Sequence, residues 1–287
     1  MNFRTDLALE RCEILGKNAS SGIETKTFEA HKARITRIDV TDIEGEKLIG
    51  KPVGRYVTVE VDPFAEHSQF IDGSLSALTE EVRAIIPKSG SVLVVGLGNS
   101  KITADALGPK CASMIFATRH IKGELLKATG LGNLRSVSVV TPGVMGETGA
   151  EASEIIKGVV QVLMPDAVIT VDALAARSTE RLGRTVQMCN TGIVPGSGVG
   201  NARQEISKRT VGVPVISIGV PTVIDAAAFV TDFNVDEGDA SKSARGMMVT
   251  PKEVDLMIER ASKLTALAIN CALQPGISPE DMLILTA

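Results

Sequence analysis

From about residue 75 the sequence alternates continuous apolar runs with amphipathic segments, and this alternation constrains the fold more than any other feature. The apolar runs are "SVLVVGLG", "LRSVSVVTP", "DAVITVDAL" and "PVISIGVP", and the segments between them include "LSALTEEVRAII", "GPKCASMIFATRHI" and "EASEIIKGVVQVLM". Strands that are apolar throughout are buried on both faces, and the helices between them supply the cover. We therefore predict an α/β fold: a mostly parallel twisted sheet with helices on both faces.

The first part of the chain has a different pattern. Within residues 30–62, "ARITRIDVTD" and "GRYVTVEVD" alternate polar and apolar residues and are separated by the turn-prone "EGEKLIGKPVG". Strict alternation is typical of half-buried strands, so this β-rich segment is expected to be antiparallel. At 287 residues the chain is long enough for one large or two modest domains.

Charge and cysteine usage exclude several classes of function. The net charge is -4 and no cluster of Lys and Arg is present, so we expect no direct nucleic-acid partner. The four cysteines are far apart and form no C-x-x-C pair, which disfavours a zinc site or a redox motif. No apolar run approaches the roughly 20 residues of a membrane span, and the first residues contain no apolar signal region. We therefore expect an intracellular protein without a membrane partner.

The glycine turn in "SVLVVGLGNSKITADALGPK" suggests a dinucleotide site, but its spacing is wrong. Gly96 and Gly98 are followed by Lys101 where the fingerprint needs a third glycine. No phosphate-binding G-x-x-x-x-G-K-[ST] motif occurs elsewhere. We therefore expect no nucleotide cofactor. In the second glycine cluster, "IVPGSGVGN", Gly196 and Gly198 are compatible either with a tight turn or with a loop that lines a substrate site.

An acidic residue accompanies each of two apolar runs. Asp105 follows the run that ends at Val95, and Asp172 ends the run in "DAVITVD". Open α/β sheets bind ligands at the carboxyl ends of parallel strands, so both carboxylates are expected at one edge of the sheet. A close pair of carboxyl groups cannot both ionise easily, so one keeps its proton and the pair can activate water. Each acid taken alone is also compatible with a helix cap or a turn.

Other arrangements for hydrolysis are poorly supported. The chain has no G-x-S-x-G motif, and Ser197 lacks the glycine two residues before it. The three histidines, His31, His67 and His120, show no H-E-x-x-H spacing, and all of them precede Asp172. This disfavours a histidine-dependent triad and a histidine-rich metal site.

Eight collinear segments between Arg4 and Ala272 resemble the germination proteases of spore-forming bacteria. They are "GRYVTVE", "VVGLGN", "ADALGPK", "TPGVMG", "DALAARS", "TGIVPGSGVGN", "GVPVISIGVPTVIDA" and "MVTPKEVD". The resemblance implies an endopeptidase that degrades small acid-soluble spore proteins during germination. It further implies a fold similar to the hydrogenase-maturation peptidases, a homotetramer, a location in the spore core cytoplasm and synthesis as a self-processing zymogen.

The resemblance also implies that Asp105 and Asp172 are catalytic. Related maturation peptidases bind a metal through an additional histidine, and no histidine follows His120 here. We therefore expect an aspartic-type reaction with no metal. Two alternatives stay open: a metallopeptidase with the same acids as ligands, and a catalytically silent peptide-binding relative.

The family cleaves after Glu or Asp, before a hydrophobic residue followed by Ala, and "FRTDLALE" contains such a site at Asp6, Leu7 and Ala8. We expect cleavage between Asp6 and Leu7, which divides the chain into a propeptide, 1–6, and one peptidase domain, 7–287. Phe3 stands where the family prefers a further acid.

Substrates with an acid before the cut call for a cation near the cleft. From the matching motifs we predict Lys110, Arg177 and Arg203 as substrate-binding cations, together with Gly196 and Gly198 from the glycine loop. Each of these cations is also compatible with a solvated surface role.

Overall fold

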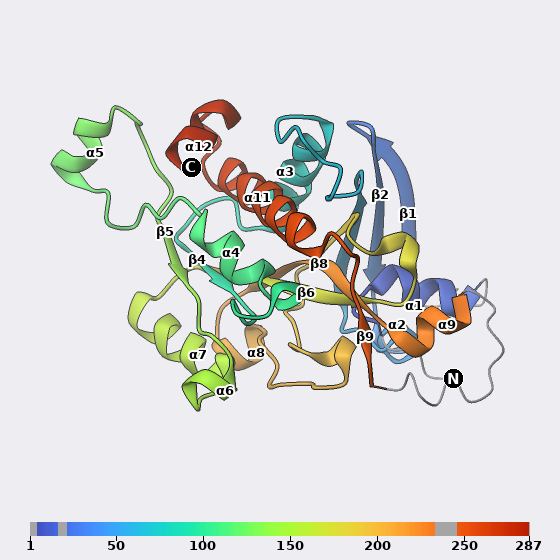
Figure 1. Ribbon diagram of the computed structural model, residues 1–287. Helices are drawn as coiled ribbons and strands as arrows, with labels where there is room; N and C mark the ends of the chain where they lie inside the picture. Colours follow the sequence, from blue (N-terminus) through green and yellow to red (C-terminus); the bar gives the residue numbers. More distant parts are fainter. Residues whose placement is uncertain (1–4, 17–21, 233–245, 287) are drawn as a thin grey trace.

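The computed structural model describes residues 5–16, 22–232 and 246–286 (Figure 1). Most of the predicted propeptide, residues 1–4, lies outside the described residues. The strands are β1 (Ile23–Ala30), β2 (Ala33–Val40), β3 (Gly54–Glu60), β4 (Val92–Gly96), β5 (Val137–Val140), β6 (Ala167–Ala176), β7 (Thr185–Cys189), β8 (Val215–Asp225) and β9 (Met248–Val249).

The helices enclose one sheet. They are α1 (Ala8–Leu15), α2 (Ile43–Ile49), α3 (Gly73–Ile85), α4 (Leu107–Ser113), α5 (Gly123–Thr129), α6 (Met145–Thr148), α7 (Ala152–Leu163), α8 (Lys208–Val211), α9 (Ala226–Asp232), α11 (Val254–Leu273) and α12 (Pro279–Leu285). Three short 3-10 turns, η2 (Thr103–Asp105), η3 (Thr179–Arg181) and η4 (Ser197–Val199), lie in loops near the carboxyl ends of strands.

The sheet has the strand order β1-β2-β3-β7-β8-β6-β4-β5, with β9 paired to β8. Parallel pairing is limited to β5, β4, β6 and β8, while β7 joins β8 to the antiparallel strands β1–β3. The prediction of an α/β fold with an antiparallel N-terminal part is confirmed. The prediction of a mostly parallel sheet is corrected, because the N-terminal strands continue the same sheet through β7 and antiparallel pairings outnumber parallel ones.

Alternate residues of β4 explain how the two faces are covered. Val92 and Val94 belong to the core formed with α3, α4 and α11, whereas Leu93 and Val95 pack with α7 and α8. Successive side chains of a strand point to opposite faces, so a fully apolar strand requires helices on both sides. Figure 1 shows α3, α4 and α11 on one side of the sheet and α7 and α8 on the other.

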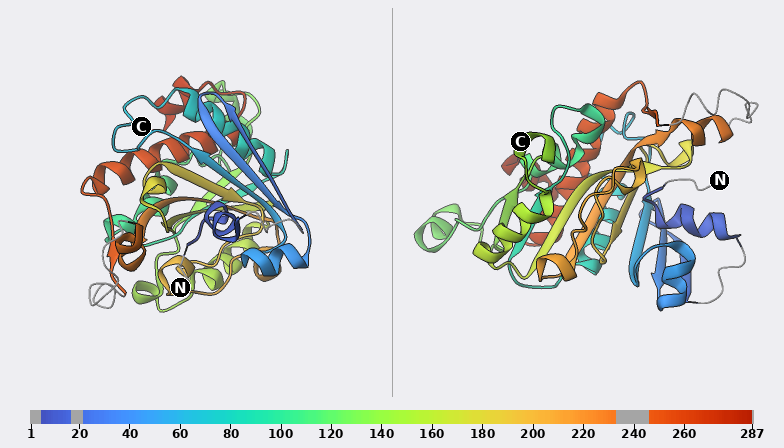
Figure 2. Two further views of the ribbon diagram at one scale, coloured as in Figure 1. Left: turned by 90° about the vertical axis from the view of Figure 1, so that its right-hand side faces the viewer. Right: turned by 90° about the horizontal axis from the view of Figure 1, so that it is seen from below.

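The N-terminal part forms one end of the molecule. Figure 2 shows α1, α2 and β1–β3 together at this end and α5 at the opposite one. The turn-prone segment between β2 and β3 contains a helix, α2, because Asp42 accepts a hydrogen bond from the backbone N–H of Gly45 and caps it. Before α1, residue Asp6 pairs with β6: its N–H donates to the carbonyl oxygen of Ala175 (3.0 Å).

Candidate active site

Asp105 is held beside the end of β4 by a tight turn. The strand ends at Gly96, and the chain returns through Gly98 to the short turn η2, whose last residue is Asp105. Gly98 has a φ of 111°, and a Cβ atom there would lie 2.1 Å from the carbonyl oxygen of Asp105. The backbone N–H of Asn99 donates to the Asp105 carboxylate (2.8 Å). This glycine therefore serves to bring an acid close to the sheet.

Asp172 reaches the same edge in another way. It lies inside β6 and not at its end, which corrects the position predicted from the sequence. Its neighbour Val171 is paired with Gly96, the last residue of β4, so β6 continues beyond β4 from Asp172 onward. The Asp172 side chain is 5% exposed. The two predicted acids therefore flank one cavity of about 500 Å³, which Asp6 also lines.

The environment of these acids favours protonation, most strongly at Asp172. Burial, followed by the nearby charges of Asp105 and Asp6, raises the pKa of Asp172 well above its usual range. Burial also raises the pKa of Asp105, while the hydrogen bond from Asn99 opposes that shift. In a cluster of acids, burial favours the protonated form most strongly at the most buried group, which here is Asp172.

The Asp6 side chain is bound like a ligand. Its carboxylate accepts hydrogen bonds from the backbone N–H of Ala175 (2.9 Å) and from the hydroxyl of Ser197 (2.7 Å). Gly198 completes this carboxylate-binding site, the Asp6 seat, because a Cβ atom there would lie 2.1 Å from an Asp6 carboxylate oxygen. The carbonyl oxygen of Asp6 accepts a hydrogen bond from Nε2 of Gln187 (3.0 Å).

The two residues after Asp6 are buried. Leu7 is 0% exposed and packs against Leu174 and Ala176 of β6. Ala8 is also 0% exposed and packs among residues of β2 and β3. The site therefore holds an acid, a hydrophobic residue and an alanine in succession.

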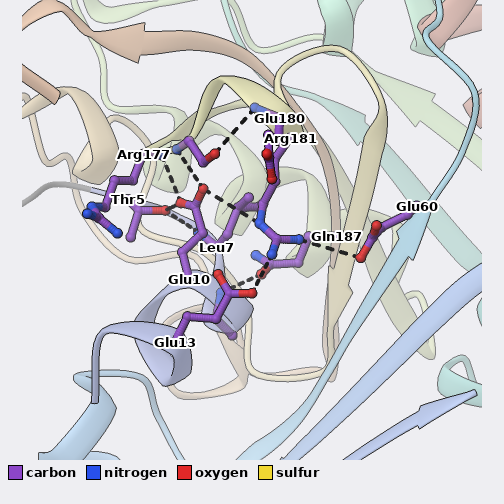
Figure 3. Close-up of polar contacts among 11 residues, drawn as sticks. Thr5, Leu7, Glu10, Glu13, Glu60, Arg177, Glu180, Arg181 and Gln187 are labelled. Atoms are coloured by element: carbon purple, nitrogen blue, oxygen red, sulfur yellow. Dashed lines mark hydrogen bonds and ion pairs between the residues drawn. The ribbon is translucent and has the colours of Figure 1, made fainter. Parts of the chain in front are cut away.

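Farther along, Glu10 anchors the segment to the loop after β6 (Figure 3). Its carboxylate accepts hydrogen bonds from the backbone N–H groups of Arg177 (2.8 Å) and Ser178 (2.9 Å) and from the Thr5 hydroxyl. The Arg181 guanidinium lies 3.8 Å from Glu10 and also forms an ion pair with Glu13. Glu10 is buried, and burial raises the pKa of its carboxyl in spite of these donors.

A comparison with family models shows the family to which the chain belongs. The family model described as "Germination protease" matches residues 6–236, which include Asp6, both cavity acids and the glycine loop. The chain belongs to the germination protease family.

Individual germination proteases match over nearly their whole length. One from Caldanaerobacter subterraneus subsp. tengcongensis is 40% identical over 98% of this chain and 97% of its own length. One from Clostridium perfringens is 39% identical over 98% of both chains, and one from Priestia megaterium is 36% identical over 98% of this chain and 96% of its own. The family resemblance predicted from the eight segments is thereby confirmed.

Among solved structures, the chain is similar to the [NiFe] hydrogenase maturation protease HycI from Thermococcus kodakarensis. The match covers 66% of this chain and 98% of that one, with 16% identity and a TM-score of 0.38. At this TM-score the expected likeness to the fold of the maturation peptidases stays a prediction.

The structure separates the predicted substrate-binding residues into two groups. Gly198 contacts the Asp6 carboxylate, and Gly196 and Arg203 line the cavity of the two acids. Arg177 instead offers its backbone N–H to Glu10, and Lys110 is exposed on α4 and lines neither the acid cavity nor the seat of Asp6.

Besides Ala175 and Ser197, two further neighbours of Asp6 are not among the residues predicted from the sequence. Lys51 lines a second cavity beside Asp6, and burial lowers its pKa while the Asp6 carboxylate opposes that shift. Gln187, on β7, contacts the Asp6 carbonyl. Gln187 lies on β7 and Lys51 in the loop before β3, and the sequence places neither element beside β6. The nearest matching segments are "GRYVTVE", which begins three residues after Lys51, and "TGIVPGSGVGN", which begins four residues after Gln187.

Two further properties concern metals and membranes. Within the described ranges, no group of three or more His, Cys, Asp or Glu side chains is arranged to hold a metal ion. None of the helices in those ranges combines the length and apolar composition needed to cross a bilayer.

Proposed function

We propose that this germination protease is an aspartic-type endopeptidase that cuts its own chain between Asp6 and Leu7 and then degrades small acid-soluble spore proteins in the spore core. The observation that carries the proposal is the position of the Asp6–Leu7 bond. Its acid lines the same cavity as Asp105 and Asp172, and the residues on either side of the bond are held by hydrogen bonds to the Asp6 carboxylate and by the burial of Leu7.

The proposed reaction uses the two acids in different roles. Asp105 accepts a proton from a water molecule, whose oxygen attacks the carbonyl carbon of Asp6, while protonated Asp172 gives its proton to the carbonyl oxygen. The resulting diol collapses: the C–N bond to Leu7 breaks, the leaving nitrogen takes the proton from Asp105, and one hydroxyl returns its proton to Asp172. The products are a free carboxyl group on Asp6 and a free amino group on Leu7.

The same contacts support a substrate class. An acid before the cut fits the donors of Ala175 and Ser197, and a hydrophobic residue followed by alanine fits the buried places of Leu7 and Ala8. Small, loosely folded acidic proteins can present such segments in extended form. We further propose that residues 1–6 are the propeptide of a zymogen, that residues 7–287 form a single domain, and that the enzyme is a homotetramer with no nucleic-acid partner.

The test is the N-terminus of the purified chain after incubation at mildly acidic pH, determined by mass spectrometry. We expect a chain that starts at Leu7, and we expect it to be absent from Asp105→Asn and Asp172→Asn. Asp255→Asn, which removes an exposed acid from α11, is the matched control and should be processed at the normal rate. A chain that stays intact and also leaves a spore-protein peptide uncut would identify a silent binding relative.

A chelator titration distinguishes the aspartic-type reaction from the metallopeptidase alternative. Aspartic-type processing should continue at the same rate in excess chelator. Loss of processing that is restored by a divalent metal would instead assign the two acids as metal ligands.

A further inference from the structure

The side chain of Gln187 contacts the chain on both sides of the Asp6–Leu7 bond. Its Nε2 donates a hydrogen bond to the carbonyl oxygen of Asp6 (3.0 Å), and its Oε1 accepts one from the backbone N–H of Ala8 (2.6 Å). The orientation of the amide follows from these partners, because a carbonyl oxygen can only accept and a backbone N–H can only donate. Gln187 is 7% exposed; its contact with Ala8 is buried, and its contact with the Asp6 carbonyl oxygen is partly buried.

Strand register places Gln187 opposite Asp172. Gln187 of β7 is paired with Gly219 of β8, and Gly219 is paired with Asp172 of β6. Paired residues point to the same face of a sheet, and two strand spacings separate the outer pair by about 10 Å. Gly219 has no room for a side chain, because a Cβ atom there would lie 2.6 Å from Cγ of Leu174 and 2.8 Å from the Asp172 carbonyl oxygen. The row Gln187–Gly219–Asp172 therefore places the amide and the acid on one face of the sheet, with the Leu174 side chain over the glycine between them.

Resting on the proposed function, we infer that Gln187 is a catalytic residue that polarises the scissile carbonyl and holds the peptide on the leaving side. As water attacks, negative charge develops on the carbonyl oxygen, and a fixed N–H donor in a site shielded from water stabilises that charge. The bond from Ala8 fixes the amide plane on the leaving side, which keeps the C–N bond in position for protonation.

A neutral amide suits this position better than a charged side chain. Arginine or lysine would form an ion pair with the buried acids and oppose protonation of Asp172, since a nearby cation favours the ionised carboxylate. Glutamine supplies one donor and one acceptor without altering that balance. Figure 3 shows its side chain extending toward the segment that begins at Leu7.

Two variants of Gln187 distinguish its role as a donor to the Asp6 carbonyl from its role as an acceptor for the Ala8 N–H. Gln187→Met keeps the length of the side chain and removes both functions. Gln187→Glu keeps the acceptor for Ala8 but at neutral pH lacks the donor for the carbonyl; protonation of the introduced carboxyl restores an O–H donor at low pH. Gln161→Glu, on the exposed side of α7, is the control for the same chemical change.

The measurement is the single-turnover rate at which the Leu7 N-terminus forms between pH 4.5 and 7, with each variant expressed relative to wild type at the same pH. This normalisation removes the titration of the charged groups that line the cavity around Gln187, which are Asp6, Arg11, Lys51 and Glu205. We expect Gln187→Met to be slower by about 10²- to 10³-fold at every pH, the effect of removing one oxyanion donor. Gln187→Glu should show a similar loss at pH 7 and a smaller one as the pH falls.

Folding is monitored by the thermal midpoint of each variant. A rate for Gln187→Met within about threefold of wild type would overturn the inference and leave the proposed function standing. A large loss in both variants with no recovery of Gln187→Glu at low pH would also overturn it, because it would assign Gln187 a purely structural role. If wild type itself never forms the Leu7 terminus, the proposed function fails and this inference fails with it.

Discussion

Replacing Gly198 with alanine tests whether the seat of the Asp6 carboxylate determines cleavage. The added Cβ atom would lie 2.1 Å from an Asp6 carboxylate oxygen and 2.7 Å from the Cβ atom of Ala175. Displacement of the Asp6 side chain relieves the first clash, whereas the second, with a residue of β6, requires a shift of the turn that carries Gly198. Gly198 does not need a left-handed φ, so the substitution acts through these two contacts and not through an unfavourable φ.

The size of the effect follows from the hydrogen bonds that Asp6 would lose. Its carboxylate accepts one bond from Ala175 and one from Ser197. A hydrogen bond to a charged group contributes about 1.5–3 kcal/mol, so the loss of both corresponds to about 3–6 kcal/mol. At 1.36 kcal/mol for each factor of ten, Gly198→Ala should slow the appearance of the Leu7 terminus by about 10²- to 10⁴-fold. Ser197→Ala removes only one bond and should slow it by about 10- to 10²-fold.

The assay is the time course of the new N-terminus by mass spectrometry, with circular dichroism to confirm folding. Gly158→Ala is the control, since Gly158 lies within α7 and a Cβ atom there has nothing within 4 Å. That variant should process normally and be at least as stable as wild type, because alanine has the higher helix propensity. A folded Gly198→Ala chain that is processed at the wild-type rate would show that binding of Asp6 in this seat is not needed for the cut.

Two further predictions concern stability. Burial raises the pKa of Asp172 in the folded protein, so its ionised form opposes folding; that penalty is fully present above the raised pKa and disappears as the pH falls below the unfolded value of about 3.9. Asp172→Asn should therefore increase the free energy of unfolding in urea at pH 7.5 and have little effect at pH 4, and an equal effect at both pH values would refute the assigned burial. Leu7→Ala, made in the Asp105→Asn background to keep the bond intact, should lower the free energy of unfolding by about 2–5 kcal/mol, the range for leucine truncation in a core. A change below about 0.5 kcal/mol would mean that Leu7 does not occupy its pocket.

The parallel half of the fold was predictable because its signals are local. Continuous apolar runs at β4, β6 and β8 require cover on both faces, and the rule for the carboxyl ends of such strands located Asp105 and Asp172. The prediction for Asp172 was inexact because the sequence does not show that β6 continues for four residues beyond it. That extension depends on pairing with β8, which is a long-range contact.

The other half of the site depends on contacts that no short segment encodes. Gln187 lies in one row with Asp172 only because β7 runs antiparallel beside β8, and β7 is a five-residue strand without a distinctive pattern. The matching motifs predict Lys110 and Arg177 as substrate-binding cations, yet the donors to the Asp6 carboxylate are the backbone N–H of Ala175 and the hydroxyl of Ser197. The acid is bound by a backbone N–H and a hydroxyl instead, and backbone donors cannot be identified from residue types.

The anchoring of Glu10 has a consequence for the order of events after the proposed cut. Hydrolysis frees residues 1–6, but Leu7 and Ala8 stay buried and Glu10 stays bonded to Arg177 and Ser178. The new amino terminus is then a product tethered to its own enzyme, and a short tether holds it at an effective concentration in the millimolar range. On the proposed function, a substrate must compete with this terminus for the same site, so degradation would begin when residues 7–10 leave the site and not at the cut itself.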